Sequence, residues 1–304
     1  MKIVVTGASG FVGGALVPWL REHGHEVVRL VRARAQARDE ISWDPKTADL
    51  DPAKLIGVNA IVHLAGANVA AGRWTDRRKR EIMSSRVDGL RTLTAAIRRG
   101  SQPPEVLISA SATGFYGDRG DEILDESSGP GTGFLVEVCQ AWEAGLGDAR
   151  ALGMRTASVR LGVVLGPDGG ALAKMVPVFR LGLGGRLGSG RQWMSWIAME
   201  DLLSVFHQAV TDREFEGVIN AVSPDAVTNA DFTRSLARVV RRPAVLPVPS
   251  FVLRGIFGQM ADETLLASTR VVPGRLEGWG FRFARPDLAE ALAHALADFD
   301  RPSK

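Results

Sequence analysis

The chain has 304 residues, of which 45% are hydrophobic and 23% charged, and its formal net charge is +3. This length suffices for one large domain or two small ones around a sizeable core. The mild, scattered positive charge argues against nucleic-acid binding. A single cysteine, Cys139, excludes an internal disulfide and a thiolate zinc site, and the five histidines lack metal-ligand spacing. We therefore expect no metal.

The first residues and the longest apolar runs bear on localisation. A core strand begins at residue 3 with no charged region before it, so we expect no secretory signal peptide. No uncharged apolar stretch approaches the roughly 18 residues of a membrane span. With the lone cysteine, these features favour a soluble, cytoplasmic protein without a membrane partner.

A glycine-rich turn follows the first expected strand, residues 2–6. Glycines spaced three apart permit a tight turn, close approach of a phosphate and close packing of helix on strand. The helix that follows, with Leu16, Val17 and Leu20 at helical spacing, points its free N–H groups at the anion. This context favours a dinucleotide pyrophosphate site over a merely flexible loop. The expected cofactor contacts here are Gly7, Ser9, Gly10, Phe11, Val12 and Gly13.

The second expected strand, residues 26–31, ends at Arg32. A cofactor without a 2′-phosphate usually meets an acidic residue at this strand end, which accepts from the ribose hydroxyls. A guanidinium group instead pairs bidentately with phosphate, so Arg32 favours NADP(H). Arg34 and Arg38 follow closely, and for these two cofactor binding and ordinary solvent exposure are equally good interpretations.

Strand-like and helix-like segments alternate, which is typical of a parallel sheet with helices on both faces. The sequence predicts a long helix from Thr75, its cap, to about Arg99, and a final helix from Pro286. Pro18 lies inside the first helix, where it should bend the chain or remove a hydrogen bond. Further strands are expected at 60–64, 106–110, 156–164 and 218–222.

After residue 167 the alternation loosens, with glycines between 182 and 190 and prolines between 243 and 249. We interpret residues 1–167 as an NADP-binding domain and residues 168–304 as a smaller C-terminal α/β substrate lobe. The lobe is partly interleaved, since the strand at 218–222 belongs to the sheet. The predicted fold class is therefore α/β, a Rossmann-like doubly wound parallel sheet with a smaller second lobe.

Several long motifs resemble the extended short-chain dehydrogenase/reductase superfamily. They are Thr6–Gly13, His63–Gly66, Ser109–Gly117, Arg160–Pro167 and Trp196–Leu202. More narrowly, Gly72–Thr75, Gly188–Ile197 and Leu246–Pro249 resemble an NAD-dependent epimerase/dehydratase-like subfamily, some members of which carry a SulA-type cell-division-inhibitor name. The resemblance implies cofactor contacts from Leu64, Ala65, Gly66 and Ser109, and raises the expectation of a homodimer. It specifies no substrate.

The superfamily's usual proton-transfer pair, a tyrosine with a lysine four residues later, is missing. The only tyrosine is Tyr116, and the residue four later is Gly120. By pattern, the pair falls on Phe134 and Val138, with Glu143 nine residues after the tyrosine position. Neither phenylalanine nor valine can transfer a proton or shift a pKa, so the standard machinery is absent.

Two interpretations follow. In the first, the protein is an atypical NADP(H)-dependent oxidoreductase or epimerase whose acid–base group has moved. Ser111 matches the family's catalytic serine, and Tyr116 could supply the proton if a cation such as Arg119, Arg86 or the cofactor lowers its pKa. For Tyr116, a packed aromatic with a satisfied hydroxyl is an equally good interpretation. Cys139 is expected to be a core residue.

In the second interpretation the protein binds NADP(H) without turning it over, as a regulator or scaffold. The second lobe argues against this, because its arginines and tryptophans suit an anionic or nucleotide-linked small-molecule substrate. Solvated arginines and core tryptophans are the competing explanation. The expected substrate-binding residues are Arg73, Trp74, Arg180, Arg191 and Trp193.

Overall fold

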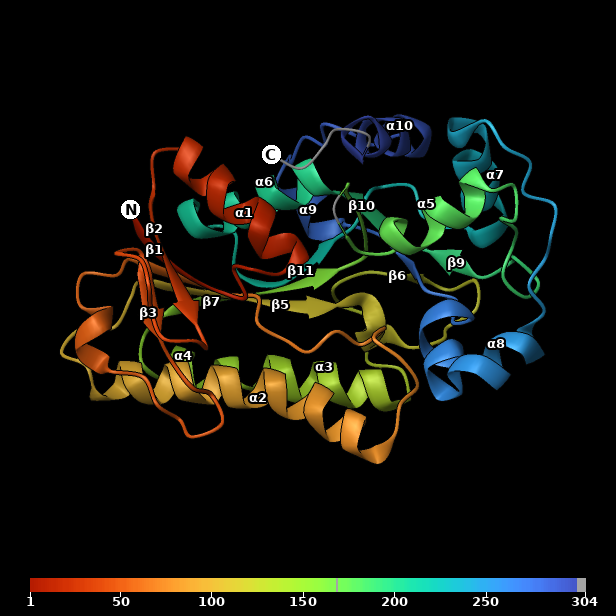
Figure 1. Cartoon of the computed structure of the whole chain (residues 1–304). Coiled ribbons are helices and arrows are strands. Elements are labelled where there is room, and N and C mark those ends of the chain that lie inside the picture. The colour runs from red at the N-terminus through yellow and green to blue at the C-terminus, as the bar shows by residue number, and fades with distance from the viewer. Residues whose placement is uncertain (168, 300–304) are drawn as a thin grey trace.

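A parallel sheet of seven strands forms the centre of the computed structural model, which describes residues 1–167 and 169–299 (Figure 1). The first strand, β1, is an inner strand of the sheet; the next two strands in the chain are added on one side of it, and the remaining four on the other. The reversal opens a crevice at the carboxyl ends of the strands. In spatial order the strands are β11 (Gly217–Ala221), β7 (Arg155–Leu161), β5 (Val106–Ala112), β4 (Ala60–His63), β1 (Lys2–Thr6), β2 (Glu26–Val31) and β3 (Glu40–Ser42).

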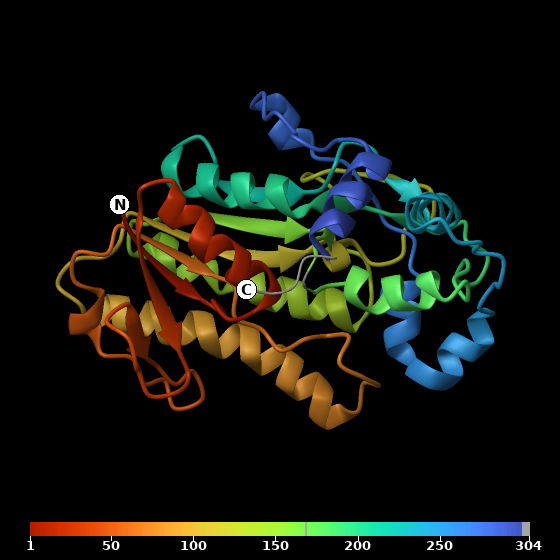
Figure 2. The same cartoon turned by 45° about the horizontal axis from the view of Figure 1, so that its top comes forward.

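Helices cover both faces of the sheet (Figure 1; Figure 2). Helices α1 (Phe11–Glu22) and α6 (Met199–Thr211) lie on one face, and α2 (Asp76–Arg99), α3 (Phe134–Ala144) and α4 (Leu146–Ala151) on the other. Because both faces are covered, the strands are nearly continuous apolar runs, and Ile3, Val4 and Val5 are fully buried. None of the described helices is both long and apolar enough to cross a membrane.

Smaller elements form the second lobe beyond the carboxyl ends of the strands. Its core joins α5, α7 and α10 through buried side chains such as Phe179, Phe232 and Leu292. The helices are α5 (Leu172–Arg180), α7 (Asn229–Val240), α8 (Ser250–Phe257) and α10 (Leu288–Phe299), whereas α9 (Gly274–Gly278) packs on β11 of the large sheet through Leu276. The short strands are β6 (Ile123–Leu124), β8 (Val163–Leu165), β9 (Trp193–Met194), β10 (Trp196–Ala198), β12 (Val227–Thr228) and β13 (Arg270–Val271).

The structure confirms the expected fold class and the six expected strands, with one division. The segment 156–164 forms two strands, β7 and β8, separated at Gly162. A Cβ atom at Gly162 would lie 2.7 Å from Ser195 O, so the chain turns there in tight contact with its neighbour. Strand β8 then leaves the large sheet and pairs with β10.

Helix ends follow the sequence signals with small differences. The Thr75 hydroxyl accepts a hydrogen bond from Arg78 N–H and caps α2, as expected. Helix α10 begins two residues after Pro286, because Asp287 Oδ1 accepts from Glu290 N–H at 2.9 Å and serves as the cap. Pro18 is accommodated inside α1. The expected lobe boundary at residue 168 and the terminal residues 300–304 lie outside the described residues.

Candidate cofactor cleft and polar network

The turn between β1 and α1 fits its glycines closely. Gly7 has φ of +68°, and a Cβ atom there would lie 2.8 Å from Ala65 N. A Cβ atom at Gly13 would lie 2.2 Å from Gly7 O, so only glycine allows this packing of helix on turn. Gly10 begins α1 without any side-chain cap, which leaves the first N–H groups of the helix available to an anion.

The loop after β4 is fixed against β1 by a buried threonine–histidine pair. Thr6 Oγ1 accepts from Leu64 N–H and Ala65 N–H, at 3.1 Å each, so its own proton is donated to His63 Nδ1 at 2.8 Å. His63 Nε2 is buried and has no partner in the described residues. Burial, together with the nearby Arg86 charge, lowers the pKa of His63 to about 3. His63 is therefore a neutral anchor for this loop.

The end of β2 is open and basic. Arg32 is exposed, and no side chain among the described residues pairs with it. Nearby, Asp39 receives hydrogen bonds from Arg29 and Arg21, and the Arg29 bond is the main reason that the pKa of Asp39 falls to about 2. The charge of Asp39 is thus already balanced by Arg29 and Arg21, whereas Arg32 remains available to a ligand.

The other expected cofactor residues occupy different surroundings. Ser9 is exposed in the glycine turn, and Val12 lies in the first turn of α1. The ring of Phe11 packs under the glycines that follow β8, where a Cβ atom at Gly169 would approach it to 2.6 Å. Ser109 is buried, and its hydroxyl donates to Ala110 O at 3.0 Å.

At the carboxyl end of β5, Ser111 belongs to a buried polar network. Its hydroxyl donates to Glu143 Oε1 at 2.7 Å. Arg160 of β7 binds the same carboxylate through Nε at 2.8 Å and Nη2 at 2.7 Å. Its Nη1 donates to Tyr116 OH at 2.9 Å, and its Cζ lies 3.4 Å from the centre of the Phe115 ring. All nitrogens of this guanidinium are therefore engaged within the protein.

Tyr116 is fully buried, and its hydroxyl is surrounded by partners. It lies 2.8 Å from Asn220 Oδ1 and 2.9 Å from Asp125 O, the two acceptors for its single proton. Burial is the main cause that raises its pKa. The cation beside it is Arg160, since Arg119 pairs with Glu122. This geometry fits the packed, structural interpretation of Tyr116; its catalytic role stays a prediction.

Helix α3 carries the positions of the missing pair. Phe134 packs edge-on against Trp74, with ring centres 5.1 Å apart, and Val138 is buried. Cys139 is buried too, and burial raises the pKa of its thiol to about 11. Both features agree with the expected core position. The start of α3 is capped from the second lobe by Glu263, whose carboxylate accepts from Phe134 N–H and Leu135 N–H.

The expected substrate residues lie in several different surroundings. Trp74 is buried, and its Nε1 donates to Val69 O at 2.8 Å. Arg73 reaches across to α8, where Nη1 donates to Gly255 O at 3.3 Å. Trp193 Nε1 donates to Asp121 at 2.8 Å, and Arg270 stacks on its ring. Arg191 is exposed.

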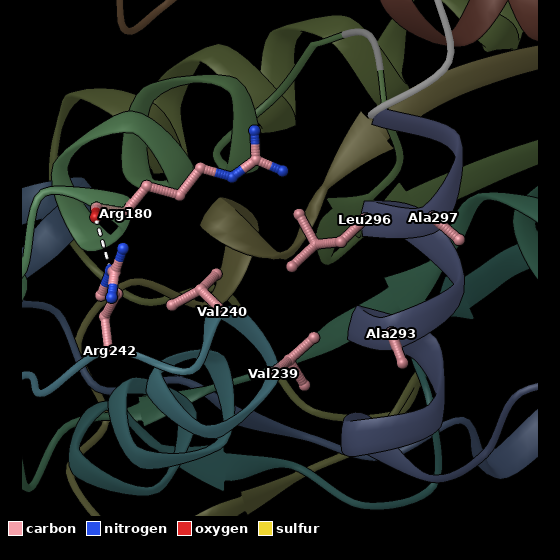
Figure 3. Close-up of a pocket in the computed structure, with 7 residues that line it drawn as sticks. All are labelled: Arg180, Val239, Val240, Arg242, Ala293, Leu296 and Ala297. Atoms are coloured by element: carbon pink, nitrogen blue, oxygen red, sulfur yellow. Dashed lines mark hydrogen bonds between the residues drawn. The ribbon is translucent and has the colours of Figure 1, made fainter.

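Arg180 lines a cavity of about 510 Å³ in the second lobe (Figure 3). Figure 3 shows its guanidinium extending from α5 toward α10, while its main-chain oxygen accepts from Arg242 Nε at 3.1 Å. Arg242 also lines the cavity, and apolar side chains complete the wall: Val239, Val240, Ala293, Leu296 and Ala297. The strand ends that carry Ser111 do not contribute to this wall.

The sequence predicted no role in the site for Arg160 or Asn220, and it offered Arg86 only as a cation for Tyr116, a place that Arg160 takes. Arg160 and Asn220 are polar residues within expected buried strands. Arg86 occupies a position on the apolar stripe of α2, four residues after Ile82 and four before Leu90. A charged or amide side chain at such positions indicates a buried polar partner.

The fold and the glycine-lined turn define a dinucleotide-binding protein of the Rossmann type, and the comparisons with known proteins specify the family. Residues 3–222 match the "NAD dependent epimerase/dehydratase family", and residues 248–295 match a "domain of unknown function (DUF1731)". An epimerase family protein of Mycobacterium bovis is 41% identical over 293 residues, which are 96% of this chain and 97% of that protein.

Two solved structures are similar over nearly the whole chain. The human epimerase family protein SDR39U1 (isoform 2), crystallised with NADPH, has a TM-score of 0.90 and 33% identity, covering 98% of this chain and 100% of that chain. A nucleoside-diphosphate sugar epimerase from Corynebacterium glutamicum has a TM-score of 0.80 and 37% identity, covering 97% of this chain and 58% of that chain. The chain belongs to the NAD dependent epimerase/dehydratase family, and within it resembles the SDR39U1 proteins.

Proposed function

We propose that the protein is an NADP(H)-dependent oxidoreductase or epimerase-like enzyme that works without the usual tyrosine–lysine pair. One observation carries the cofactor assignment. Uncapped N–H groups at the start of α1 lie under glycines that admit no Cβ, and the neighbouring strand β2 ends at the unpaired Arg32. These groups fit a pyrophosphate and a 2′-phosphate. The NADPH in the human relative supports the same cofactor.

The nicotinamide ring, when bound, exchanges a hydride with the substrate carbon. The residue best suited to handle the accompanying proton is Ser111. Because its proton is donated to Glu143, the lone pairs of Ser111 Oγ can accept from a substrate hydroxyl. During oxidation the substrate proton would move to Ser111 as the serine proton moves to Glu143, and reduction would reverse both transfers. Arg160 holds the carboxylate in place for this relay.

The proposed substrate is a small anionic or nucleotide-linked molecule. Two arginines supply positive charge at the second lobe. Arg191 is exposed there, and the side chain of Arg73 reaches α8. The nucleoside-diphosphate sugar epimerase among the similar structures supports this class. The names of these relatives say nothing of cell division. We further propose a cytoplasmic protein and leave a homodimer as a prediction for size-exclusion chromatography.

A non-catalytic NADP(H)-binding regulator is the second candidate. It is favoured by the apolar side chains at Phe134 and Val138 and by the fully engaged hydroxyl of Tyr116. The two candidates share the cofactor and differ only in turnover. Screening NADPH oxidation against a panel of carbonyl compounds separates them, and Ser111→Ala should abolish any activity found while leaving NADPH affinity unchanged.

The test of the cofactor assignment is a titration with NADPH and NADH, followed by ligand fluorescence and thermal shift. We expect tight NADPH and weak NADH binding. Arg32→Ala should weaken NADPH about 10-fold to 100-fold, the range for hydrogen bonds to charged groups, with little effect on NADH. Arg91→Ala, at an exposed arginine of α2, is the matched control. Equal losses for both nucleotides would show that Arg32 does not contact the 2′-phosphate.

A further inference from the structure

Two segments of the second lobe contain basic residues but no acidic ones. Residues 172–199 and 232–261 make up less than a fifth of the chain. They nevertheless contain nine of its 37 arginines and lysines, and none of its 34 acidic residues. Because the whole chain carries a formal net charge of only +3, the remainder of the chain is net negative. Positive charge is therefore concentrated in these two segments.

The fold brings the two segments together. Val248 N–H donates to Arg186 O at 2.9 Å, and Gly188 N–H donates to Val248 O at 2.8 Å. A Cβ atom at Gly185 would overlap Leu246 O, so the two stretches of chain are in direct contact. In Figure 1 and Figure 2 the connection from α7 to α8 passes the chain that follows α5 at the same end of the molecule. The basic residues next to this contact thus belong to one surface.

Large apolar side chains are exposed in the same two segments. Leu181 is 74% exposed, Val245 75% and Phe251 73%, so these side chains project into solvent with little packing beneath them. Exposed apolar groups gathered in one place indicate a contact surface. Of the ten exposed large apolar side chains in the described residues, seven belong to these segments: Val178, Leu181, Leu183, Val245, Leu246, Phe251 and Ile256.

Several arginines near these side chains are not neutralised by the protein. Arg186, Arg241 and Arg242 are exposed, and no carboxylate in the described part of the chain pairs with any of the three. Arg242 Nε donates to a main-chain oxygen, which carries no full charge. Arg254, by contrast, pairs with Asp262. The charges of the first three arginines remain available to an anionic partner.

We propose that this surface binds anionic lipid membranes peripherally. The apolar side chains would enter the boundary between headgroups and acyl chains, and the arginines would contact lipid phosphates. A nucleic acid would match the charge but would leave Leu181 and Val245 in water. An acidic protein would need a matching hollow for each projecting side chain, whereas a fluid bilayer adapts to them. The contact requires no spanning helix, and it does not depend on the cofactor.

Vesicle flotation with the full chain tests the proposal. Wild type is mixed with vesicles of phosphatidylcholine alone, or of phosphatidylcholine with an equal amount of phosphatidylglycerol. We expect binding to the mixed vesicles only. The partition coefficient should fall as the salt concentration rises, because salt screens the attraction between the arginines and the lipid phosphates.

Two double substitutions separate the electrostatic and the apolar contributions. Arg186→Gln with Arg241→Gln should lower the partition coefficient about 5-fold for each arginine removed. Val245→Ser with Phe251→Ser should lower it by about 10-fold or more, because both side chains lose their burial in the bilayer boundary. All four residues are exposed, so thermal unfolding of the variants should be nearly unchanged.

Matched controls alter exposed side chains of the nucleotide domain. Arg98→Gln removes an arginine from α2, and Ile56→Ser removes an apolar side chain that is also exposed. Both variants should bind mixed vesicles as wild type does. Failure to bind vesicles, equal binding to both kinds of vesicle, or equal losses in the controls would overturn the proposal. Binding to polyglutamate but not to vesicles would also overturn it, in favour of an acidic protein partner.

Discussion

Two arginines beside α3, the buried Arg160 and the half-buried Arg86, differ in how many of their hydrogen bonds the protein provides. Arg160 is bound on every nitrogen by Glu143 and Tyr116, and thereby ties β7 to α3 and to the turn after β5. Arg86 has only main-chain oxygens of its own helix and the neighbouring loop as partners among the described residues. A guanidinium group with every nitrogen hydrogen-bonded inside the protein stabilises the fold, whereas one with free N–H donors can still bind a ligand.

The largest expected effect on stability comes from replacing Arg160, whose guanidinium is fully hydrogen-bonded. Arg160→Met would leave Glu143 without its ion-pair partner and Tyr116 without a donor, and should destabilise the protein by about 3 to 5 kcal/mol. Urea denaturation measures this loss. Arg98→Met, which breaks the exposed pair with Asp148, should cost no more than about 1 kcal/mol. A similar small cost for Arg160→Met would show that the network is not a stability element.

The pH dependence of stability tests whether the buried His63 is neutral in the fold. The pKa of His63 is about 3 in the fold and about 6.5 in an unfolded chain, so below pH 6.5 only the unfolded chain gains its proton. Stability should therefore fall by about 2 kcal/mol between pH 7 and pH 5 from this residue alone. His25 and His207 also have lowered pKa values and add in the same direction.

Comparison with His63→Asn isolates the contribution of His63, since the other histidines are retained. Denaturation curves at several pH values should show a shallower pH dependence for the variant. The same slope in both proteins would contradict a buried, neutral His63.

The smallest expected effect on stability is that of Tyr116→Phe, which tests whether Tyr116 is structural or catalytic. Tyr116→Phe keeps the ring but removes the hydroxyl from Asn220, Asp125 and Arg160, and should cost about 1 to 3 kcal/mol because buried partners lose a bond. Thermal unfolding measures this cost, and NADPH titration should show no change in affinity. Unchanged stability with abolished turnover would instead establish Tyr116 as the proton donor.

The sequence predicted those parts of the molecule that depend on local patterns. Alternating apolar runs located six strands of the sheet, Thr75 marked the start of α2, and glycine spacing marked the turn at Gly7. The network around Arg160 depends on contacts between β5, β7, β11 and α3, which no local pattern reveals. For the same reason the sequence did not reveal that the indole of Trp74, an expected substrate-binding residue, is buried and packs on Phe134.

The carboxylate of Glu263 joins the two family-matched regions through hydrogen bonds. It lies in residues 248–295, yet it caps a helix of residues 3–222 at Phe134, the position to which the sequence pattern assigns the usual tyrosine. A truncated chain that ends after β11 would expose the first turn of α3 to water and remove an anion from its positive end. The C-terminal segment is therefore an intramolecular ligand of the nucleotide domain, and engineering that exchanges one region between relatives must carry this contact with it.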